Sequence, residues 1–196
     1  MTRLASKKYC LFFKDEVIDL SPKEIKKMSE IYNHSLFGKI NLEDLEEYYE
    51  TEIKVNGKTI EVDLNFLEET FSKSDIQRLE LINTFIEKAS EYQLIAKDAI
   101  TKDYTNKGAT KVYLDHHVQE MSEEELNNLL KDVNSNLNKQ TQMLEKLNLV
   151  SISFYPEDID SFMILDHTIG RDLTQYVIVV SFDIEENLNE EVIMES

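Results

Sequence analysis

The apolar residues of this chain follow two spacings, every second position towards both ends and every third or fourth position in the middle. The clearest alternation lies on either side of the dipeptide Asn56-Gly57. Its apolar members are Ile53, Val55, Ile60, Val62, Leu64 and Phe66. Because Asn and Gly both tolerate the positive φ angles of a type I′ turn, this pattern predicts a β-hairpin.

The middle of the chain has the 3.6-residue period of amphipathic helices. One face of the first predicted helix carries Ile76, Leu79, Ile82, Phe85, Ile86 and Ala89. We expect helices over residues 75–91, continuing to about 105, and then over residues 112–121 and 123–147. Ser122 and Glu125 form a capping box at the start of the last helix. The Asn-rich stretch 134–138 is a candidate break within it.

Alternating segments on both sides of this midsection predict strands. They cover residues 36–42, 149–155, 162–164, 176–182 and 192–194. Strands, then helices, then strands predict an α+β fold, in which an antiparallel sheet carries the helical midsection on one face.

The first 35 residues differ from the rest in charge, since they carry seven Lys or Arg against five Asp or Glu. Ser21-Pro22 is a plausible helix start, and Ile25, Met28, Ile31 and Tyr32 follow at helical spacing. We therefore expect residues 1–35 to form an N-terminal extension with a short amphipathic helix, and residues 36–196 to form a single α+β domain.

The formal net charge of the 196 residues is -18 at pH 7. Such a negative surface repels phosphate backbones and anionic lipid headgroups, which argues against nucleic-acid and membrane partners and favours basic ones. The first ten residues contain no apolar run typical of a signal peptide, and Cys10 is the single cysteine. No stretch reaches the ~18 apolar residues of a spanning helix. We expect a cytoplasmic protein.

Two segments contain candidate chemistry. His116-His117 lies on a predicted helix, where His116 and Glu120 share a face, but adjacent helical positions diverge by about 100° and do not converge on one metal ion. A solvated or hydrogen-bonded histidine is the alternative. The segment from Asp166 to Arg171 joins two apolar strands. It is either a turn that uses Gly170 and neutralises nearby carboxylates with Arg171, or an anion pocket built from His167 and Arg171.

Other catalytic signatures are weak or missing. Four glycines form no phosphate-binding loop or nucleophile elbow, so the sequence predicts no cofactor. Cys10 has Lys7 and Lys8 nearby but no evident base, which favours an incidental thiol. Carboxylate pairs have little specificity among 39 Asp and Glu residues.

Several short segments resemble an uncharacterised family of small acidic bacterial proteins, once labelled predicted outer membrane proteins. They are Phe37-Gly38-Lys39-Ile40, Asn56-Gly57-Lys58, residues 61–66, 150–156 and 166–170, and Met194-Glu195-Ser196. The resemblance covers about residues 36–196, and departs from the family pattern at His167, where an aromatic residue is expected. It implies no activity, cofactor or catalytic residue. The membrane label conflicts with the helical midsection and the expected lack of a signal peptide.

The function we expect is that of a non-catalytic binding protein, an immunity-like or accessory factor that engages a basic protein. An acidic run beside two tyrosines is the candidate binding surface, because carboxylates steer encounters and tyrosines anchor interfaces. Its residues are Glu43, Asp44, Glu46, Glu47, Tyr48 and Tyr49. The alternative is that these charges only solvate the surface and the tyrosines belong to the core. A second hypothesis is a hydrolase or metal-dependent enzyme that uses the Asp166 to Arg171 segment and the His116/His117 helix.

Overall fold

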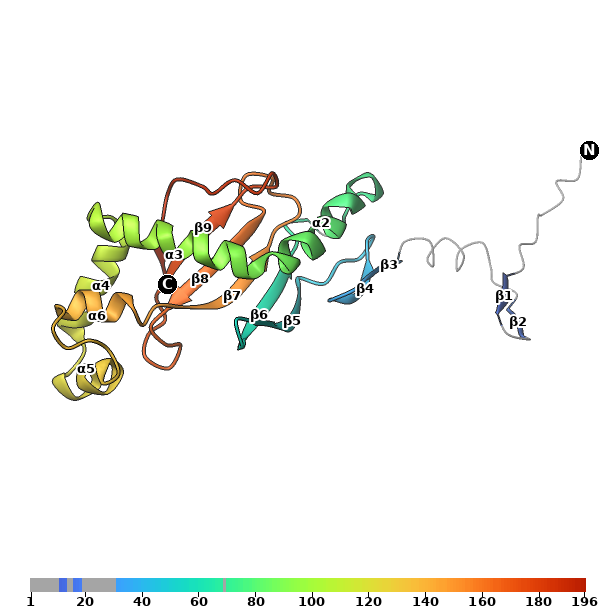
Figure 1. Cartoon of the computed structure of the whole chain (residues 1–196). Coiled ribbons are helices and arrows are strands. Elements are labelled where there is room, and N and C mark those ends of the chain that lie inside the picture. The colour runs from blue at the N-terminus through green and yellow to red at the C-terminus, as the bar shows by residue number, and fades with distance from the viewer. Residues whose placement is uncertain (1–10, 14–15, 19–30, 69) are drawn as a thin grey trace, which may run out of the picture.

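The computed structural model describes residues 11–13, 16–18, 31–68 and 70–196, and they form an α+β fold. Its main element is a six-stranded sheet with the strand order β10-β9-β8-β7-β6-β5 (Figure 1). The six strands are β5 (Tyr48–Val55), β6 (Lys58–Asn65), β7 (Asn148–Phe154), β8 (Met163–Thr168), β9 (Val177–Phe182) and β10 (Ile193–Glu195). The α+β class predicted from the order of strands and helices is confirmed.

The predicted hairpin is the β5–β6 pair. Its two-residue loop is Asn56-Gly57, with φ angles of 49° and 81°. Both angles are positive, as a type I′ turn requires, so the turn predicted from this dipeptide is confirmed. The register pairs Val55 with Lys58 and Tyr48 with Asn65.

One strand pair departs from the predicted antiparallel sheet. Strands β6 and β7 are parallel, with Glu61 beside Ser151 and Leu64 beside Phe154, whereas the other neighbouring pairs of the sheet are antiparallel. The whole helical midsection connects these two strands. Parallel strands need such a long crossover, and the sequence pattern of each strand does not specify its direction.

The helices between β6 and β7 differ from the prediction in their bounds. They are η1 (Lys73–Asp75), α2 (Ile76–Glu87), α3 (Ala89–Thr105), α4 (Ala109–Glu120), α5 (Glu123–Leu130) and α6 (Lys139–Leu144). The helix predicted over 123–147 is interrupted between Leu130 and Lys139, a gap that contains the Asn-rich stretch 134–138 named as a candidate break, and Asn138 caps the start of α6 through its side chain. The capping box of Ser122 and Glu125 is present at the start of α5.

Helices α2 and α3 lie over one face of the sheet, and Figure 1 shows α3 crossing it and α4, α5 and α6 grouped at one end. Inward residues of the strands, such as Val62, Phe154 and Phe182, pack with Phe85 of α2 and Tyr92 of α3 in one core. The opposite face, which we call the open face, carries the alternate residues of each strand. These are more exposed and more polar.

Two short hairpins complete the described residues. Strands β3 (Ile31–His34) and β4 (Gly38–Asn41) form one pair, and β1 (Leu11–Phe13) and β2 (Glu16–Ile18) form another. The His34 ring lies 3.0 Å from the Leu79 carbonyl oxygen of α2, which fixes β3 to the helical layer. Most of the helix predicted near residue 25 lies outside the described residues. Its last two predicted residues, Ile31 and Tyr32, are described and belong to strand β3.

Candidate functional sites

Acidic residues oppose one another directly on the open face of the β5–β6 hairpin. Glu50 is the cross-strand neighbour of Asp63, and Glu52 is the neighbour of Glu61. Like charges at directly opposed positions destabilise a sheet. We call these four residues the acidic face. Side chains alternate between the two faces of a strand, so the register of the hairpin places these four side chains on the same face.

The acidic face continues across the sheet. Burial raises the pKa of the Asp63 carboxyl, and the neighbouring carboxylates of Glu61 and Glu50 raise it further. Burial also raises the pKa of Asp166 on β8, although a hydrogen bond from the Ser151 hydroxyl, at 2.9 Å, favours the ionised form. Burial is thus the main cause at both carboxyls, and the neighbouring carboxylates add to it, while Arg171 acts in the opposite direction.

Arg171 supplies positive charge on this side of the sheet. Its guanidinium lies 2.8 Å from the Glu61 carboxylate. This is the charge-neutralising role expected for Arg171 if the segment after Asp166 is a turn. Strand β8 ends at Thr168, and the turn begins only after it.

The structure brings together four of the six residues predicted to bind a partner. Glu46, Glu47, Tyr48 and Tyr49 line a surface hollow of about 430 Å³ with Phe37 and Glu50. We call it the tyrosine hollow.

Glu43 and Asp44 are exposed in the turn after β4 and do not line the hollow. The two tyrosines differ: Tyr48 is 53% exposed, whereas Tyr49 packs edge-on against Phe66 with ring centroids 6.0 Å apart. One tyrosine is available for contacts, and the other belongs partly to the core.

The His116/His117 pair takes part in packing. The buried His117 ring lies 2.7 Å from the Tyr113 carbonyl oxygen and 2.8 Å from the Thr174 hydroxyl. The His116 ring packs edge-on against the Tyr176 ring, and the two ring centroids are 5.2 Å apart. Helix α4 and the connection between β8 and β9 thus lie against each other, and the two histidines serve as packing contacts between them. In the described residues, no three His, Cys, Asp or Glu side chains are grouped to hold a metal ion.

His167 and Arg171 do not form the anion pocket that the sequence suggested as an alternative. His167 points to the helical layer, whereas Arg171 pairs with Glu61 on the open face. Strand β8 alternates its side chains, and Asp166 takes the open side next to His167.

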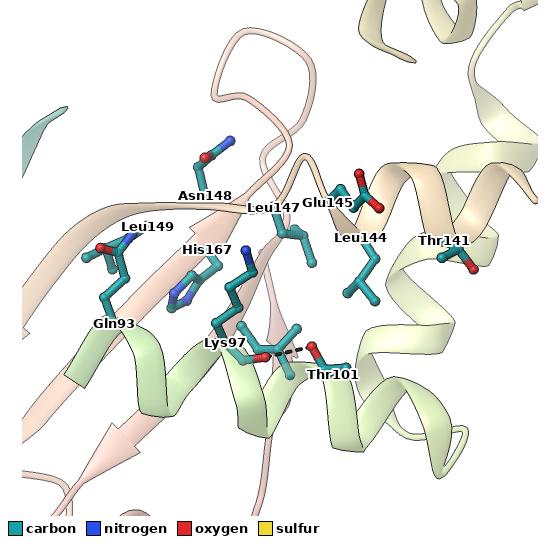
Figure 2. Close-up of a pocket in the computed structure, with 11 residues that line it drawn as sticks. Gln93, Lys97, Thr101, Thr141, Leu144, Glu145, Leu147, Asn148, Leu149 and His167 are labelled. Carbon is teal, nitrogen blue, oxygen red and sulfur yellow. Dashed lines mark hydrogen bonds between the residues drawn. The ribbon is translucent and has the colours of Figure 1, made fainter. Parts of the chain in front are cut away.

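A cavity of about 300 Å³ lies between α3, α6 and the start of β7 (Figure 2). We call it the His167 pocket. Its lining residues are Gln93, Lys97, Ile100, Thr101, Thr141, Leu144, Glu145, Leu147, Asn148, Leu149 and His167. Apolar side chains form much of the wall, and polar groups come from α3, from α6 and from the loop that follows α6.

His167 is the most deeply placed polar residue of this pocket. It is 3% exposed, and neither ring nitrogen has a hydrogen-bond partner among the described residues. Burial lowers the pKa of the imidazole to about 4, although the nearby backbone carbonyl oxygens of Leu165 and Ile178 favour the charged form, so the ring is neutral at pH 7. A buried polar group without a partner is uncommon in native proteins and needs an explanation.

The polar groups near the pocket mouth differ in whether they already form hydrogen bonds or ion pairs. The Asn148 amide donates to the Lys146 carbonyl oxygen at 2.6 Å and also accepts from Lys58. The Thr101 hydroxyl donates to the Lys97 carbonyl oxygen at 2.8 Å (Figure 2). The Lys97 ammonium forms no ion pair with any described residue. Lys97 therefore retains hydrogen-bonding capacity at the mouth, whereas both ring nitrogens of His167 are closed off from the pocket.

Sequence reasoning missed this pocket, although it singled out His167. One signal was present: Met163 and Leu165 face inward, and continued alternation puts His167 on the same side. The approach of α3 and α6 to that position depends on helix packing. The spacing of residues in the sequence does not contain it.

The fold and these surfaces define an α+β protein with an acidic sheet face on one side and an amphipathic pocket under its helices. No family model, no curated protein and no solved structure matches the chain. The resemblance to the small acidic bacterial family therefore stays a prediction. No helix in the described ranges is both long and apolar enough to cross a membrane.

Proposed function

We propose that the protein is a non-catalytic binding protein that engages a basic protein partner through the acidic face and the adjoining tyrosine hollow. The observation that carries this proposal is the direct opposition of Glu50 to Asp63 and of Glu52 to Glu61. Glu50 and Asp63 have no ion-pair partner among the described residues, whereas Glu61 is paired with Arg171, so a Lys or Arg from a partner would turn the repulsion at Glu50, Glu52 and Asp63 into attraction.

The neighbouring elements support a protein partner in particular. Strand β5 is the last strand of the sheet, so one of its edges is not paired within the sheet. The exposed Tyr48 lies on the same face as Glu50 and adds a rigid, amphipathic contact. Nucleic acids and anionic membranes are excluded from this proposal, because a net charge of -18 repels both.

The alternative of a hydrolase or metal-dependent enzyme has less support. Its two segments meet where the Tyr113 hydroxyl of α4 lies 3.1 Å from the Thr168 hydroxyl, and both ring nitrogens of His117 are occupied, by the Tyr113 carbonyl oxygen and the Thr174 hydroxyl. Neither nitrogen of the His117 ring is left free to abstract a proton or bind a metal ion, and both ring nitrogens of His167 are buried out of reach of a substrate.

The proposal is tested by capturing partners from an extract of the source cells and measuring association rates at low and high salt. We expect association to slow as salt rises, because unlike charges are screened over about 8 Å at physiological ionic strength. Glu50→Lys with Glu52→Lys should remove binding.

The matched control is Glu87→Lys with Asp98→Lys, which makes the same change in net charge at exposed positions of α2 and α3. Binding should survive in this control. A partner whose association ignores salt, or that binds both double variants equally, would refute the proposal.

A further inference from the structure

We propose that the free edge of strand β5 pairs with the same edge of a second copy of this chain, antiparallel and with Ile53 of one copy opposite Ile53 of the other. The two six-stranded sheets then continue as one. The proposal does not rest on the basic protein partner, because the backbone edge of β5 forms this contact and the side chains of the acidic face stay on the open face.

Strand β5 presents a row of backbone groups at the end of the sheet, where β6 is its only neighbour among the described strands (Figure 1). Val55 and Lys58 flank the two-residue turn and therefore form a hydrogen-bonded pair. Since such pairs alternate along an antiparallel ladder, every second residue of β5 directs its N–H and C=O away from β6. These residues are Tyr48, Glu50, Glu52 and Lys54, all exposed. None of them forms another backbone–backbone hydrogen bond within the described part of the chain.

The edge lacks the usual features that prevent strand addition. Strand β5 has eight residues, contains no proline and pairs with β6 without a register shift. Short edge strands, prolines, bulges or a covering segment normally block such an edge. Charge is the one protective feature here, and charge blocks pairing only with a strand of the same sign. A regular edge of this kind accepts an extended strand whose charges are complementary.

The charges of β5 complement one another in one register. Only outward-directed residues can form hydrogen-bonded pairs across the new contact, so the permitted two-fold arrangements are few. Centred on Ile53, the pairing places Glu52 opposite Lys54 of the second copy, and it does so twice. Centred on Glu52, it places Glu52 opposite itself, although Glu50 then faces Lys54. Centred on Thr51, it places Glu50 opposite Glu52 twice. Opposed unlike charges stabilise a strand pair and like charges destabilise it, so the register at Ile53 is favoured.

The surroundings of the edge favour the same register. Phe37, in the β3–β4 turn, lines the tyrosine hollow with Tyr48 and Glu50, so that end of β5 is partly occupied. Pairing centred on Ile53 uses residues 50–56 and leaves Tyr48 out. On the helical side of the sheet it sets Ile53 against itself, a contact between two β-branched side chains. Ile53 is half-buried at the edge of the core, and the second copy would cover it further.

A second copy fits this edge better than an unrelated strand does. Any extended segment could satisfy the backbone groups, but the spacing of Glu52 and Lys54 around Ile53 is self-complementary, as a two-fold interface requires. Lys54 forms no ion pair with described residues, and its ammonium donates only to the Thr59 hydroxyl. Its charge is therefore available to Glu52 of the second copy.

Sedimentation equilibrium of the full chain tests the pairing. One added strand pair is a small interface, so we expect a dimer with a Kd on the order of 10–100 μM. Lys54→Glu and Glu52→Lys should each weaken it about tenfold or more, because each places like charges opposite one another. Combining both substitutions exchanges the two charges and should restore the dimer at the wild-type net charge.

The matched control is Lys102→Glu, which changes the net charge as Lys54→Glu does, at an exposed position of α3. The dimer should survive in this control. A wild-type chain that stays monomeric, whether or not another segment covers the edge, would overturn the proposal. So would a charge exchange that fails to restore dimerisation.

Disulfide trapping tests the register, in a Cys10→Ser background. Ile53→Cys should form a disulfide-linked dimer, because residues opposed in a non-hydrogen-bonded pair have Cα atoms about 4.5 Å apart, within disulfide range. Thr51→Cys should not, since Thr51 faces Val55 and lies about 13 Å along the strand from its own counterpart. Equal trapping of the two cysteines would refute the register.

Should Ile53→Cys fail to fold, as judged by circular dichroism, the charge exchange at the exposed positions 52 and 54 still decides the matter. Lys54→Glu also keeps this proposal separate from the basic protein partner, because it leaves all four residues of the acidic face in place. Loss of the dimer in Lys54→Glu with partner binding retained is the expected result. Dimerisation that persists unchanged in Lys54→Glu would overturn the proposal.

Discussion

At the scale of single residues, buried histidines dominate the chemistry of this protein. Burial lowers the pKa of His34, His117 and His167. His34 and His117 have hydrogen-bond partners, whereas His167 has none among the described residues. The same residue type thus forms hydrogen bonds at two positions and is buried without a well-formed hydrogen bond at the third.

His167 should make the protein less stable in mild acid. Its pKa is about 4 in the folded protein against an ordinary 6.5. Between these values the unfolded chain binds more protons, so the free energy of unfolding falls as the pH drops from 6.5 to about 4. The loss from this group reaches roughly 3 kcal/mol at its maximum.

Urea unfolding of wild type and His167→Phe across this pH range measures the effect. The variant should show a shallower loss, since it lacks the group. Asp63 and Asp166, whose raised pKa values act in the opposite direction, contribute equally to both proteins. Parallel pH profiles would show that His167 does not titrate as described.

At the scale of elements, local signals in the sequence determine where strands and helices begin. The Asn56-Gly57 turn and the Ser122 cap are both present as predicted. Each signal acts through the backbone of a few residues, so it does not depend on the rest of the fold.

Replacing Gly57 with Val should destabilise the protein by about 1 kcal/mol or more, because a β-branched residue resists positive φ. Gly57 has a φ of 81°. The free energy of unfolding from urea denaturation is the measurement. Thr59→Val, at an exposed position of the same hairpin, should change it by less than about 0.5 kcal/mol. Equal effects of the two substitutions would contradict the type I′ turn.

Replacing Ser122 with Ala should cost about 1 kcal/mol, since the Glu125 backbone N–H loses its side-chain acceptor. Ser122→Asn keeps an acceptor at this position and should be close to wild type. Thermal unfolding of the three proteins compares them. If Asn and Ala behave alike, the side-chain cap does not stabilise α5.

At the scale of the whole molecule, net charge works against the compact state. The formal net charge is -18. On the open face, acidic residues also lie directly opposite one another: Glu50 faces Asp63, and Glu52 faces Glu61. Self-repulsion of this kind lowers stability and is screened by salt.

We therefore expect the melting temperature to rise when sodium chloride is added. The melting temperature of the Glu50→Lys, Glu52→Lys double variant should rise less, because lysines at positions 50 and 52 attract Asp63 and Glu61 on the opposite strand. Glu87→Lys with Asp98→Lys changes the net charge equally and leaves these pairs intact. If both double variants respond to salt in the same way, net charge and not the opposed pairs explains the effect.

The sequence predicted much of the fold but only part of the sites. Helix and strand periods identified most elements, and the candidate break at 134–138 lies within the gap between α5 and α6, yet Ile31 with Tyr32 is in a strand. Of the predicted partner-binding residues, four line one hollow, whereas Glu43 and Asp44 lie apart from it. Periodicity reports which face a residue occupies and not which distant segment it meets.

By itself, the sequence determined the α+β class, the Asn56-Gly57 hairpin, the Ser122 cap and the strong negative charge, because each depends on local backbone preference or on composition. Only the tertiary structure decided that β6 and β7 run parallel, and that α3 and α6 enclose His167 on the side away from Arg171. Strand direction and pocket walls depend on how residues far apart in the chain pack. No local pattern encodes that packing.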